Sequence, residues 1–523
     1  MEDQGIIDKI KSIYIIKDIF NYIKDNNIEL KLFVYSKYFQ NKLNLSYVDV
    51  KEKYLKKIGF NINDYLYIEE EKYDFNFLNI KYDNFFLEKK INKKEIEDLI
   101  YEILENKQMK GINKKNKTYI NIDSPLLEIV SKLSHFENNY TIYISQKKLD
   151  EYNVKNQYNK LFDKLNNSNI KYISIFYISN NNEIKYLNKL NLDYNKIIKL
   201  SIKVNGIQNL QYLEYVNFKE LKELNLFHNK ISDIEILKNV NFEKLEILNL
   251  EGNNISNNIN ILEYTNFKQL KELYLYNNKI SDIEVFKKVK FEQLEILNLK
   301  LNNITNINIL EYVDFKELKE LNLSYNKISD IEVLKKVNFA KLEILNLERN
   351  NISNNINILE YVNFKELQEL NLSYNTILNI EVLKKVNFAK LKILNLEWNY
   401  ISNDINILEH TNFKELKELN LYNNKISNIE VLKNVKFEKL EILNLGNNRI
   451  KNINILEYVN FKELKVLNLY YNKISDIKVL KKVNFAKLKI LNLEWNNISN
   501  NINILEDTNF KELKEINLSH NKI

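Results

Sequence analysis

Hydrophobic and polar residues follow one pattern from Leu221 onward, L-x-x-L-x-L-x-x-N-x-I, which recurs every 24 or 25 residues. In each copy the three leucines alternate with polar residues, as in a short strand with one buried face. A helix-like stretch such as EVLKKV or NILEYV follows, and then a phenylalanine. A single copy buries too few apolar residues to offset the entropy of ordering its chain, so the pattern predicts copies stacked in an array.

Thirteen clean copies follow one another in register. Weaker copies open at Ile197 and near Ile173, as expected of an end that caps an array. The clean copies alternate between two types, so the duplicated unit is 48 or 49 residues long. Position 1, the first leucine of each clean copy, is Leu221, Leu245, Leu270, Leu294, Leu318, Leu342, Leu367, Leu391, Leu416, Leu440, Leu464, Leu488 and Leu513.

These residues resemble the leucine-rich-repeat family over roughly the last two thirds of the chain. The resemblance implies an α/β solenoid, a horseshoe with a parallel β-sheet on its concave side and short helices or 3-10 turns on its convex side. In that family the position-9 asparagine bonds backbone groups of neighbouring turns that would otherwise be buried without partners. We expect the phenylalanines to close the convex side. The asparagines run from Asn229 through Asn350 to Asn521, and the phenylalanines from Phe218 through Phe339 to Phe510.

Positions 3, 5, 7 and 8 are expected to point out of the concave sheet. Positions 7 and 8 vary between copies and carry aromatic residues, which are typical interface anchors on a rigid surface. Duplication is the alternative explanation for the two tryptophans, because both lie in copies of the segment AKLKILNLEWN. The predicted partner-binding aromatic residues are Tyr325, Tyr374, Trp398, Tyr422, Tyr470, Tyr471 and Trp495.

Positions 2 and 3 add charge and apolar surface. Position 3 alternates between glutamate and isoleucine; the isoleucines either serve a partner or pack against the aliphatic parts of neighbouring side chains. Position 2 begins as a ladder of alternating lysine and glutamate, which suits neighbouring strands. Beyond Gln368 it becomes more basic, and Lys392 and Lys417 join the predicted partner-binding residues. This predicts an acidic partner that docks between the repeats opening at Leu391 and Leu513.

A different pattern occupies residues 10–45, which predict two or three short amphipathic helices. An Ile-Phe pair and the run Tyr-Ser-Lys-Tyr-Phe in this segment resemble an F-box. The resemblance implies a substrate receptor of a cullin-type ubiquitin ligase, whose box binds a Skp-type adaptor and whose repeats bind the substrate. An amphipathic helical cap is the alternative. The adaptor-binding residues that the resemblance implies are Ile19, Phe20, Ile23, Lys37 and Phe39.

The chain is therefore expected to contain four regions. Residues 1–60 form the helical F-box-like segment, and residues 61–118 a charged and aromatic connector with one helix. Residues 119–172 form an α/β lead-in that caps the first repeat, with strand-like runs TYINID and YTIYIS. Residues 173–523 hold about fifteen repeats. The sequence stops within a repeat, so we expect the last strand edge to be available for self-association.

Composition narrows the class of protein. The chain carries 77 Lys and Arg against 70 Asp and Glu, and the net charge of +7 is dispersed, so nucleic acid is not an expected partner. It has no cysteine, no signal-peptide pattern and no apolar run of ~18 residues, which predicts a cytoplasmic or nuclear protein that does not enter a membrane. Four scattered histidines and the lack of a glycine-rich phosphate loop argue against an enzyme, a metal site or a cofactor.

Taken together, the sequence predicts an intracellular scaffold that binds a protein partner on the concave face of its repeats. The narrower form of this prediction is the ubiquitin-ligase substrate receptor. A regulatory subunit of a phosphatase or small GTPase system is the alternative.

Overall fold

The computed structural model of the chain describes residues 118–121, 140–145, 172–177, 194–204, 210, 213–214, 216–499 and 502–523. These residues fall into two compact units that divide at residues 203–204. The boundaries expected near residues 60, 118 and 172 remain predictions. The F-box-like residues Ile19, Phe20, Ile23, Lys37 and Phe39 lie outside the described residues.

The described part of the first unit is made of strands. β1 (Thr118–Asn121) pairs in parallel with β2 (Tyr140–Ser145), and β2 pairs in parallel with β3 (Tyr172–Tyr177). The short 3-10 helix η3 (Tyr194–Lys196) precedes β4 (Lys199–Val204). β1 and β2 coincide with the two strand-like runs of the lead-in, and β3 and β4 lie in the two weaker repeat copies, so these four strands are confirmed.

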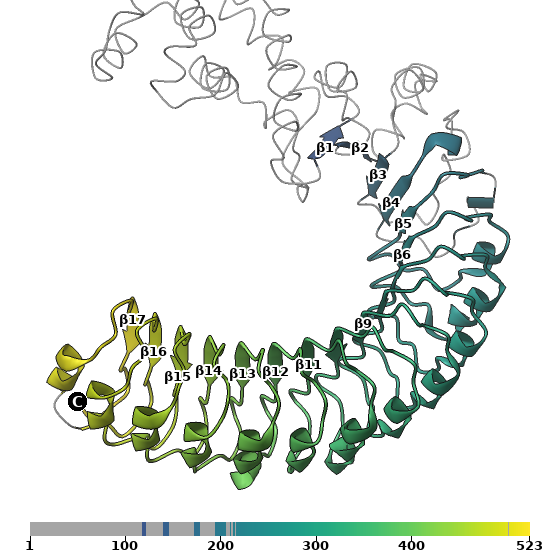
Figure 1. The fold of residues 1–523 in the computed structure, drawn as a ribbon. Coiled ribbons are helices and arrows are strands. Elements are labelled where there is room, and N and C mark those ends of the chain that lie inside the picture. Colours follow the sequence, from purple (N-terminus) through teal and green to yellow (C-terminus); the bar gives the residue numbers. More distant parts are fainter. Residues whose placement is uncertain are drawn as a thin grey trace, which may run out of the picture. The chain divides into compact units, whose positions relative to one another are not determined.

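In the second unit, positions 3 to 5 of every clean copy form a three-residue strand that pairs in parallel with the strand of the next copy. The register never slips: position 4 faces position 4, as Leu345 faces Leu370. Successive strands lie along the inner side of an arc (Figure 1). They are β5 (Glu223–Asn225), β6 (Ile247–Asn249), β7 (Glu272–Tyr274), β8 (Ile296–Asn298), β9 (Glu320–Asn322), β10 (Ile344–Asn346), β11 (Glu369–Asn371), β12 (Ile393–Asn395), β13 (Glu418–Asn420), β14 (Ile442–Asn444), β15 (Val466–Asn468), β16 (Ile490–Asn492) and β17 (Glu515–Asn517).

Short 3-10 helices line the outer side of the same arc (Figure 1). They are short because the chain must return to the next strand within 24 or 25 residues. The predicted horseshoe, with its parallel concave sheet and convex turns, is therefore confirmed. The helices are η5 (Glu235–Lys238), η6 (Ser256–Tyr264), η7 (Glu284–Lys287), η8 (Asn308–Tyr312), η9 (Glu332–Lys335), η10 (Asn354–Tyr361), η11 (Glu381–Lys384), η12 (Asn403–His410), η13 (Glu430–Lys433), η14 (Asn454–Tyr458), η15 (Lys478–Lys481) and η16 (Ile502–Asp507).

The core is a stack of identical layers. Leu342, Leu345 and Leu347 of one copy have no exposed surface, and the phenylalanine column continues from Phe339 to Phe364 with 1% exposure at each. Each inner layer is closed above and below by a layer of similar shape, so side chains that a single copy would leave exposed are buried there. In the last described copy, Ile516 at position 4 is 36% exposed. The predicted leucine and phenylalanine columns are confirmed.

The position-9 asparagines hydrogen-bond the backbone of two successive copies. The Nδ2 of Asn350 donates to the carbonyl oxygens of Leu323 (3.0 Å) and Leu347 (3.1 Å), and its Oδ1 accepts the N–H of Ile328 (3.0 Å). Asn350 itself is only 6% exposed. The asparagine ladder thus pairs backbone groups that are buried where the chain leaves each strand, as the resemblance implied.

Candidate functional site

The asparagine at position 5 hydrogen-bonds the backbone just after each strand. The Oδ1 of Asn395 accepts the N–H of Glu397 at 3.1 Å, and the Oδ1 of Asn468 accepts the N–H of Tyr470 at 2.9 Å. The same bond from position 7 recurs along the array, so the side chain fixes the turn that follows the strand. This role of position 5 was missing from the sequence prediction, although the near-invariant asparagine was visible there.

Position 8 has a left-handed backbone in all thirteen clean copies, with φ between 49° and 66°. Glycine and asparagine adopt this conformation readily, and Gly252, Asn277, Asn423 and Asn447 occupy it. For other residues it costs roughly 1–2 kcal/mol. Position 8 is nevertheless a tyrosine, tryptophan, arginine, leucine or histidine in the other copies, and these bulky residues project from the edge of the concave sheet.

The first aromatic group consists of Tyr276, Tyr325, Tyr374 and Trp398. The guanidinium of Arg349 lies between two of its rings, 5.1 Å from the centre of Tyr325 and 5.6 Å from that of Tyr374. The rings of Tyr374 and Trp398 are stacked at 5.2 Å with an interplanar angle of 10°. Lys300 lies between Tyr276 and Tyr325, with its Nζ 6.0 and 4.9 Å from the two ring centres. Cations and rings therefore alternate as far as Tyr374, and each contact contributes roughly 0.5–1.5 kcal/mol.

The second aromatic group consists of Tyr422, Tyr470, Tyr471, Trp495 and His520. Neighbouring ring centres in this group lie 4.2–6.4 Å apart, and the closest pair is Trp495 and His520, stacked at 4.2 Å. Asn423 and Asn447, joined by a side-chain hydrogen bond, occupy position 8 between the two groups.

Gly446 makes room for one stack in this second group. A Cβ there would lie 2.9 Å from Cδ2 of Tyr422, and without it the Tyr422 and Tyr470 rings stack at 6.4 Å.

All seven predicted aromatic site residues thus fall in these two groups. Three of them are substantially exposed: Trp398 by 44%, Trp495 by 45% and Tyr471 by 50%. The others are half-buried. The structure brings the predicted residues together as two contiguous surfaces and adds Tyr276, Arg349 and His520 to them.

The concave sheet beside these groups is acidic. Position 3 carries half-buried glutamates on alternate strands, including Glu320, Glu369 and Glu418. Burial, together with the neighbouring carboxylates, raises the pKa of Glu320 and Glu369 above the ordinary value of 4.5. Position 7 adds Glu348 and Glu397. The isoleucines at position 3 are half-buried rather than fully exposed.

Several lysines at position 2 have partners within the sheet. Lys222 and Lys271 both bind Glu246, at 2.7 and 2.8 Å. Lys392 donates to Oε1 of Gln368 at 2.6 Å, and Lys417 lies 3.7 Å from Glu441. Position 2 also precedes the strand whereas position 8 follows it, so Lys392 and Lys417 lie across the ribbon from the aromatic groups. Glu441 is also bound by Lys465, so position 2 beyond Gln368 keeps an excess of lysines, and the acidic partner remains a prediction from the sequence.

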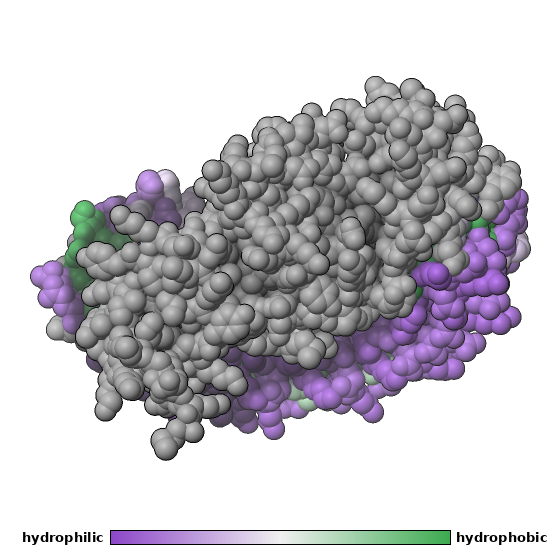
Figure 2. All heavy atoms as spheres, turned by 90° about the horizontal axis from the view of Figure 1, so that it is seen from above, coloured by the Kyte–Doolittle hydropathy of each residue, from purple (hydrophilic) through white to green (hydrophobic). Residues whose placement is uncertain are grey.

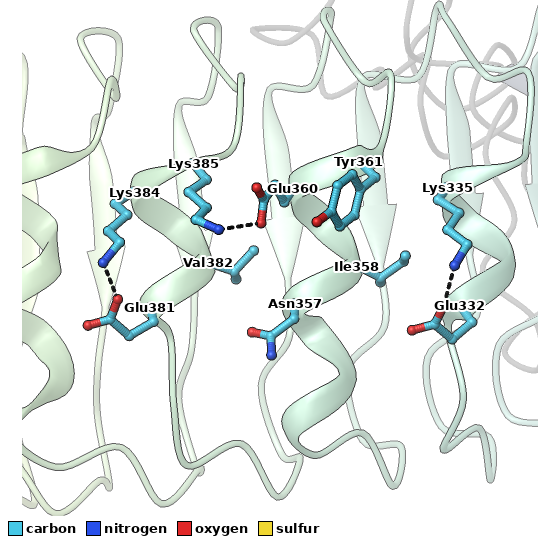
Figure 3. Close-up of a pocket in the computed structure, with 10 residues that line it drawn as sticks. All are labelled: Glu332, Lys335, Asn357, Ile358, Glu360, Tyr361, Glu381, Val382, Lys384 and Lys385. Atoms are coloured by element: carbon cyan, nitrogen blue, oxygen red, sulfur yellow. Dashed lines mark hydrogen bonds and ion pairs between the residues drawn. The ribbon is translucent and has the colours of Figure 1, made fainter.

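A shallow groove on the convex side is lined by residues of η9, η10 and η11 (Figure 3). Its charges are paired: Lys385 binds Glu360 at 2.8 Å and Lys335 binds Glu332 at 2.7 Å. Tyr361 at its rim is 64% exposed. Equivalent tyrosines, Tyr264, Tyr312 and Tyr458, are 63–67% exposed at the ends of η6, η8 and η14. The groove is a surface of separate ion pairs, whereas a catalytic site would bring its titratable groups together.

Among the described residues, no group of three or more His, Cys, Asp or Glu side chains is arranged to hold a metal ion. None of the helices in this part of the chain has the length and apolar character that crossing a membrane requires. The described surface seen in Figure 2 is mostly hydrophilic, and hydrophobic residues gather at the β17 end. Ile502, Ile516 and Ile523 are exposed there by 38%, 36% and 57%.

Comparisons with known proteins agree with this geometry. Family models described as leucine-rich repeats match residues 220–234, 268–328, 414–458, 438–482 and 486–502. No protein of curated function matches the sequence. An internalin of Listeria monocytogenes, InlF, is similar in structure, with 28% identity and a TM-score of 0.53 over 62% of this chain and 87% of its own. A leucine-rich-repeat protein of Leptospira interrogans has 20% identity and a TM-score of 0.50 over 68% and 97% of the two chains. The matched residues are similar to leucine-rich repeats, and the described repeats form a horseshoe solenoid of the leucine-rich-repeat type.

Proposed function

We propose that this protein is a binding scaffold that holds a macromolecular partner against the position-7 and position-8 edge of its concave face. The observation that carries the proposal is the left-handed backbone at position 8. Asparagine or glycine would satisfy the fold there at less conformational cost, as Asn423 and Asn447 do. The chain instead places Trp398 and Trp495 at this position, each nearly half exposed. Large exposed aromatic residues in a rigid frame are the usual anchors of an interface.

Site-specific photocrosslinking tests the proposal. A photoreactive phenylalanine analogue replaces Tyr471 on the concave edge or, as a matched control, Tyr361 on the convex side; both tyrosines are exposed, by 50% and 64%. In cells that express the full chain, we expect a discrete crosslinked product from position 471. We expect that position 361 does not give this same product. The same product from both positions, or one from position 361 alone, would contradict the proposal.

The narrower proposal, a substrate receptor of a cullin-type ubiquitin ligase, is supported by the sequence of residues 10–45, and cytoplasmic or nuclear localisation is its corollary. The test uses the full chain with Phe20→Ala and Phe39→Ala. The unmodified chain should co-purify with a Skp-type adaptor, and the double variant should not. Equal recovery of the adaptor, or no adaptor with either chain, would rule the narrower proposal out and leave the binding scaffold untouched.

A further inference from the structure

The two tryptophans lie in matching surroundings, four copies apart. Each follows a position-7 glutamate whose carboxylate is held by the position-5 asparagine of the next strand. Asn420 donates to Glu397 at 2.8 Å, and Asn517 donates to Glu494 at 2.9 Å. Each indole is stacked on one neighbouring ring, Trp398 on Tyr374 and Trp495 on His520. The chain thus presents the same pair of groups twice: an oriented carboxylate and an exposed indole.

The carboxylates lie beside the aromatic groups. Partial burial and the nearby Glu397 carboxylate raise the pKa of the Tyr374 hydroxyl. Oε1 of Glu494 lies 4.0 Å from Nε2 of His520, whose ring is stacked on Trp495. Each tryptophan is therefore accompanied by negative charge at its own stack.

The chain itself shows which ligand such surroundings accept. In the copy that opens at Leu342, position 8 is Arg349 instead of tryptophan, and its guanidinium lies between the rings of Tyr325 and Tyr374. Lys300 similarly places its Nζ 4.9 Å from the centre of the Tyr325 ring. Cations from this chain occupy the ring faces there. At Trp398 and Trp495 no lysine or arginine of the described residues does so, although a carboxylate is present to bind one.

The strands between the two tryptophans offer donors to an extended backbone. The Oδ1 atoms of Asn444 and Asn468 accept the N–H groups of Gly446 and Tyr470, which fixes both amides. Their Nδ2 groups have no hydrogen-bond acceptor among the described residues and lie on the concave sheet, half-buried. An extended chain has carbonyl oxygens available for such donors, whereas a helix uses its own carbonyls internally.

The spacing sets the length of the occupant. Trp398 follows β12 and Trp495 follows β16. Four steps of about 4.8 Å between neighbouring strands separate them by about 19 Å. An extended chain rises about 3.3 Å per residue, so six residues cover that distance. Side chains six residues apart also project from the same face of an extended segment, because six is an even number.

We propose, resting on the function proposed above, that the partner presents an extended segment with two cationic side chains six residues apart. One cation contacts Glu397 and Trp398, and the other contacts Glu494 and Trp495. The backbone between them runs across β13 to β15 and accepts hydrogen bonds from Asn444 and Asn468. The occupant is thus a basic polypeptide segment, in agreement with the acidic character of the concave sheet.

Fluorescence anisotropy with labelled peptides tests this proposal on the full chain. One peptide of glycine and serine carries arginines at positions i and i+6, and a charge-matched peptide carries them at i and i+2. We expect the first to bind at least about tenfold more tightly, because only it engages both carboxylates at once. Glu397→Gln combined with Glu494→Gln should abolish this preference while keeping the shape and the asparagine bonds. Glu251→Gln is the matched control, because Glu251 also occupies position 7 but precedes Gly252.

Equal binding of the two peptides would overturn the proposal, as would a preference that survives in the double variant. Tighter binding of a single-stranded RNA than of either peptide would also overturn it, and would point to stacking of bases instead. If neither peptide binds but position 471 still crosslinks to a partner, the cationic segment is wrong and the concave scaffold stands. If position 471 gives no crosslink, the proposed function fails as well.

Discussion

Replacing Asn350 with alanine should destabilise the array far more than replacing its neighbour Asn351 with alanine. Asn350 is 6% exposed and is bonded to the backbone of two copies. Asn351 is exposed, and its contribution to the fold is a backbone bond from its N–H to the carbonyl of Ile328, at 2.8 Å, which alanine retains. The two variants remove the same side chain from adjacent residues, so the comparison isolates the ladder.

The size of the effect follows from the groups left behind. Asn350→Ala leaves the N–H of Ile328 without its side-chain partner. The carbonyls of Leu323 and Leu347 each lose one of two donors, because Asn326 and Asn375 still donate to them at 3.0 Å. An orphaned buried group costs about 1–3 kcal/mol and each further lost bond about 0.5–1.5 kcal/mol, so we expect a loss of about 2–5 kcal/mol at the damaged interface. An exposed asparagine changed to alanine should shift stability by no more than about 0.5 kcal/mol.

Urea unfolding and amide hydrogen exchange measure this difference. A solenoid can separate at one weakened interface, so Asn350→Ala should unfold in two steps, with faster exchange at Ile328 and unchanged exchange in distant copies. Asn351→Ala should unfold like the unmodified chain. Equal unfolding free energies for the two variants, within about 0.5 kcal/mol, would refute the structural role given to the ladder.

Three further outcomes are expected. Trp398→Asn should change the unfolding free energy by less than about 1 kcal/mol in urea titrations, because lost stacking is offset by an easier left-handed backbone; a loss of several kcal/mol would make the indole structural. The contribution of Glu320 and Glu369 to stability should fall as the pH rises from 4.5 through their raised folded-state pKa values, since the folded state binds more protons there. Changing both to glutamine should raise stability at pH 7 relative to pH 4.5; an unchanged pH profile of the urea midpoint would contradict that. Gly446→Ala should displace the Tyr422 ring, seen as altered aromatic NMR shifts, and unaltered shifts would show that the ring had room.

The repeating frame could be predicted because it depends on short-range pattern. The period, the strand at positions 3 to 5, the buried leucines and phenylalanines and the bonded asparagines such as Asn350 all follow from which residues recur at fixed spacing. The aromatic residues at positions 7 and 8 could also be located, because the strand period places them at the edge of the concave face. Each of these features depends only on the residues of one copy and of the copy next to it.

Properties that depend on which side chains contact each other could not be predicted from the sequence in this way. The sequence shows an excess of lysines at position 2 beyond Gln368, but not that Lys417 and Lys465 share one partner, Glu441. Sequence shows the composition of a column but not which charges neutralise each other across strands. The left-handed backbone at Trp398 was equally hidden, because tryptophan is not a residue that normally indicates it. The half-buried state of Glu369, which raises its pKa, likewise depends on the depth of the concave sheet.

If the tryptophans at the left-handed position serve a partner and not the fold, replacing them should weaken binding and leave stability nearly unchanged. Titration calorimetry with the partner captured through position 471 compares the unmodified chain with Trp398→Asn combined with Trp495→Asn. We expect the double variant to keep its unfolding free energy within about 2 kcal/mol and to lose more than about 100-fold in affinity, because two interface anchors are removed. Unchanged affinity in a folded double variant would contradict this expectation.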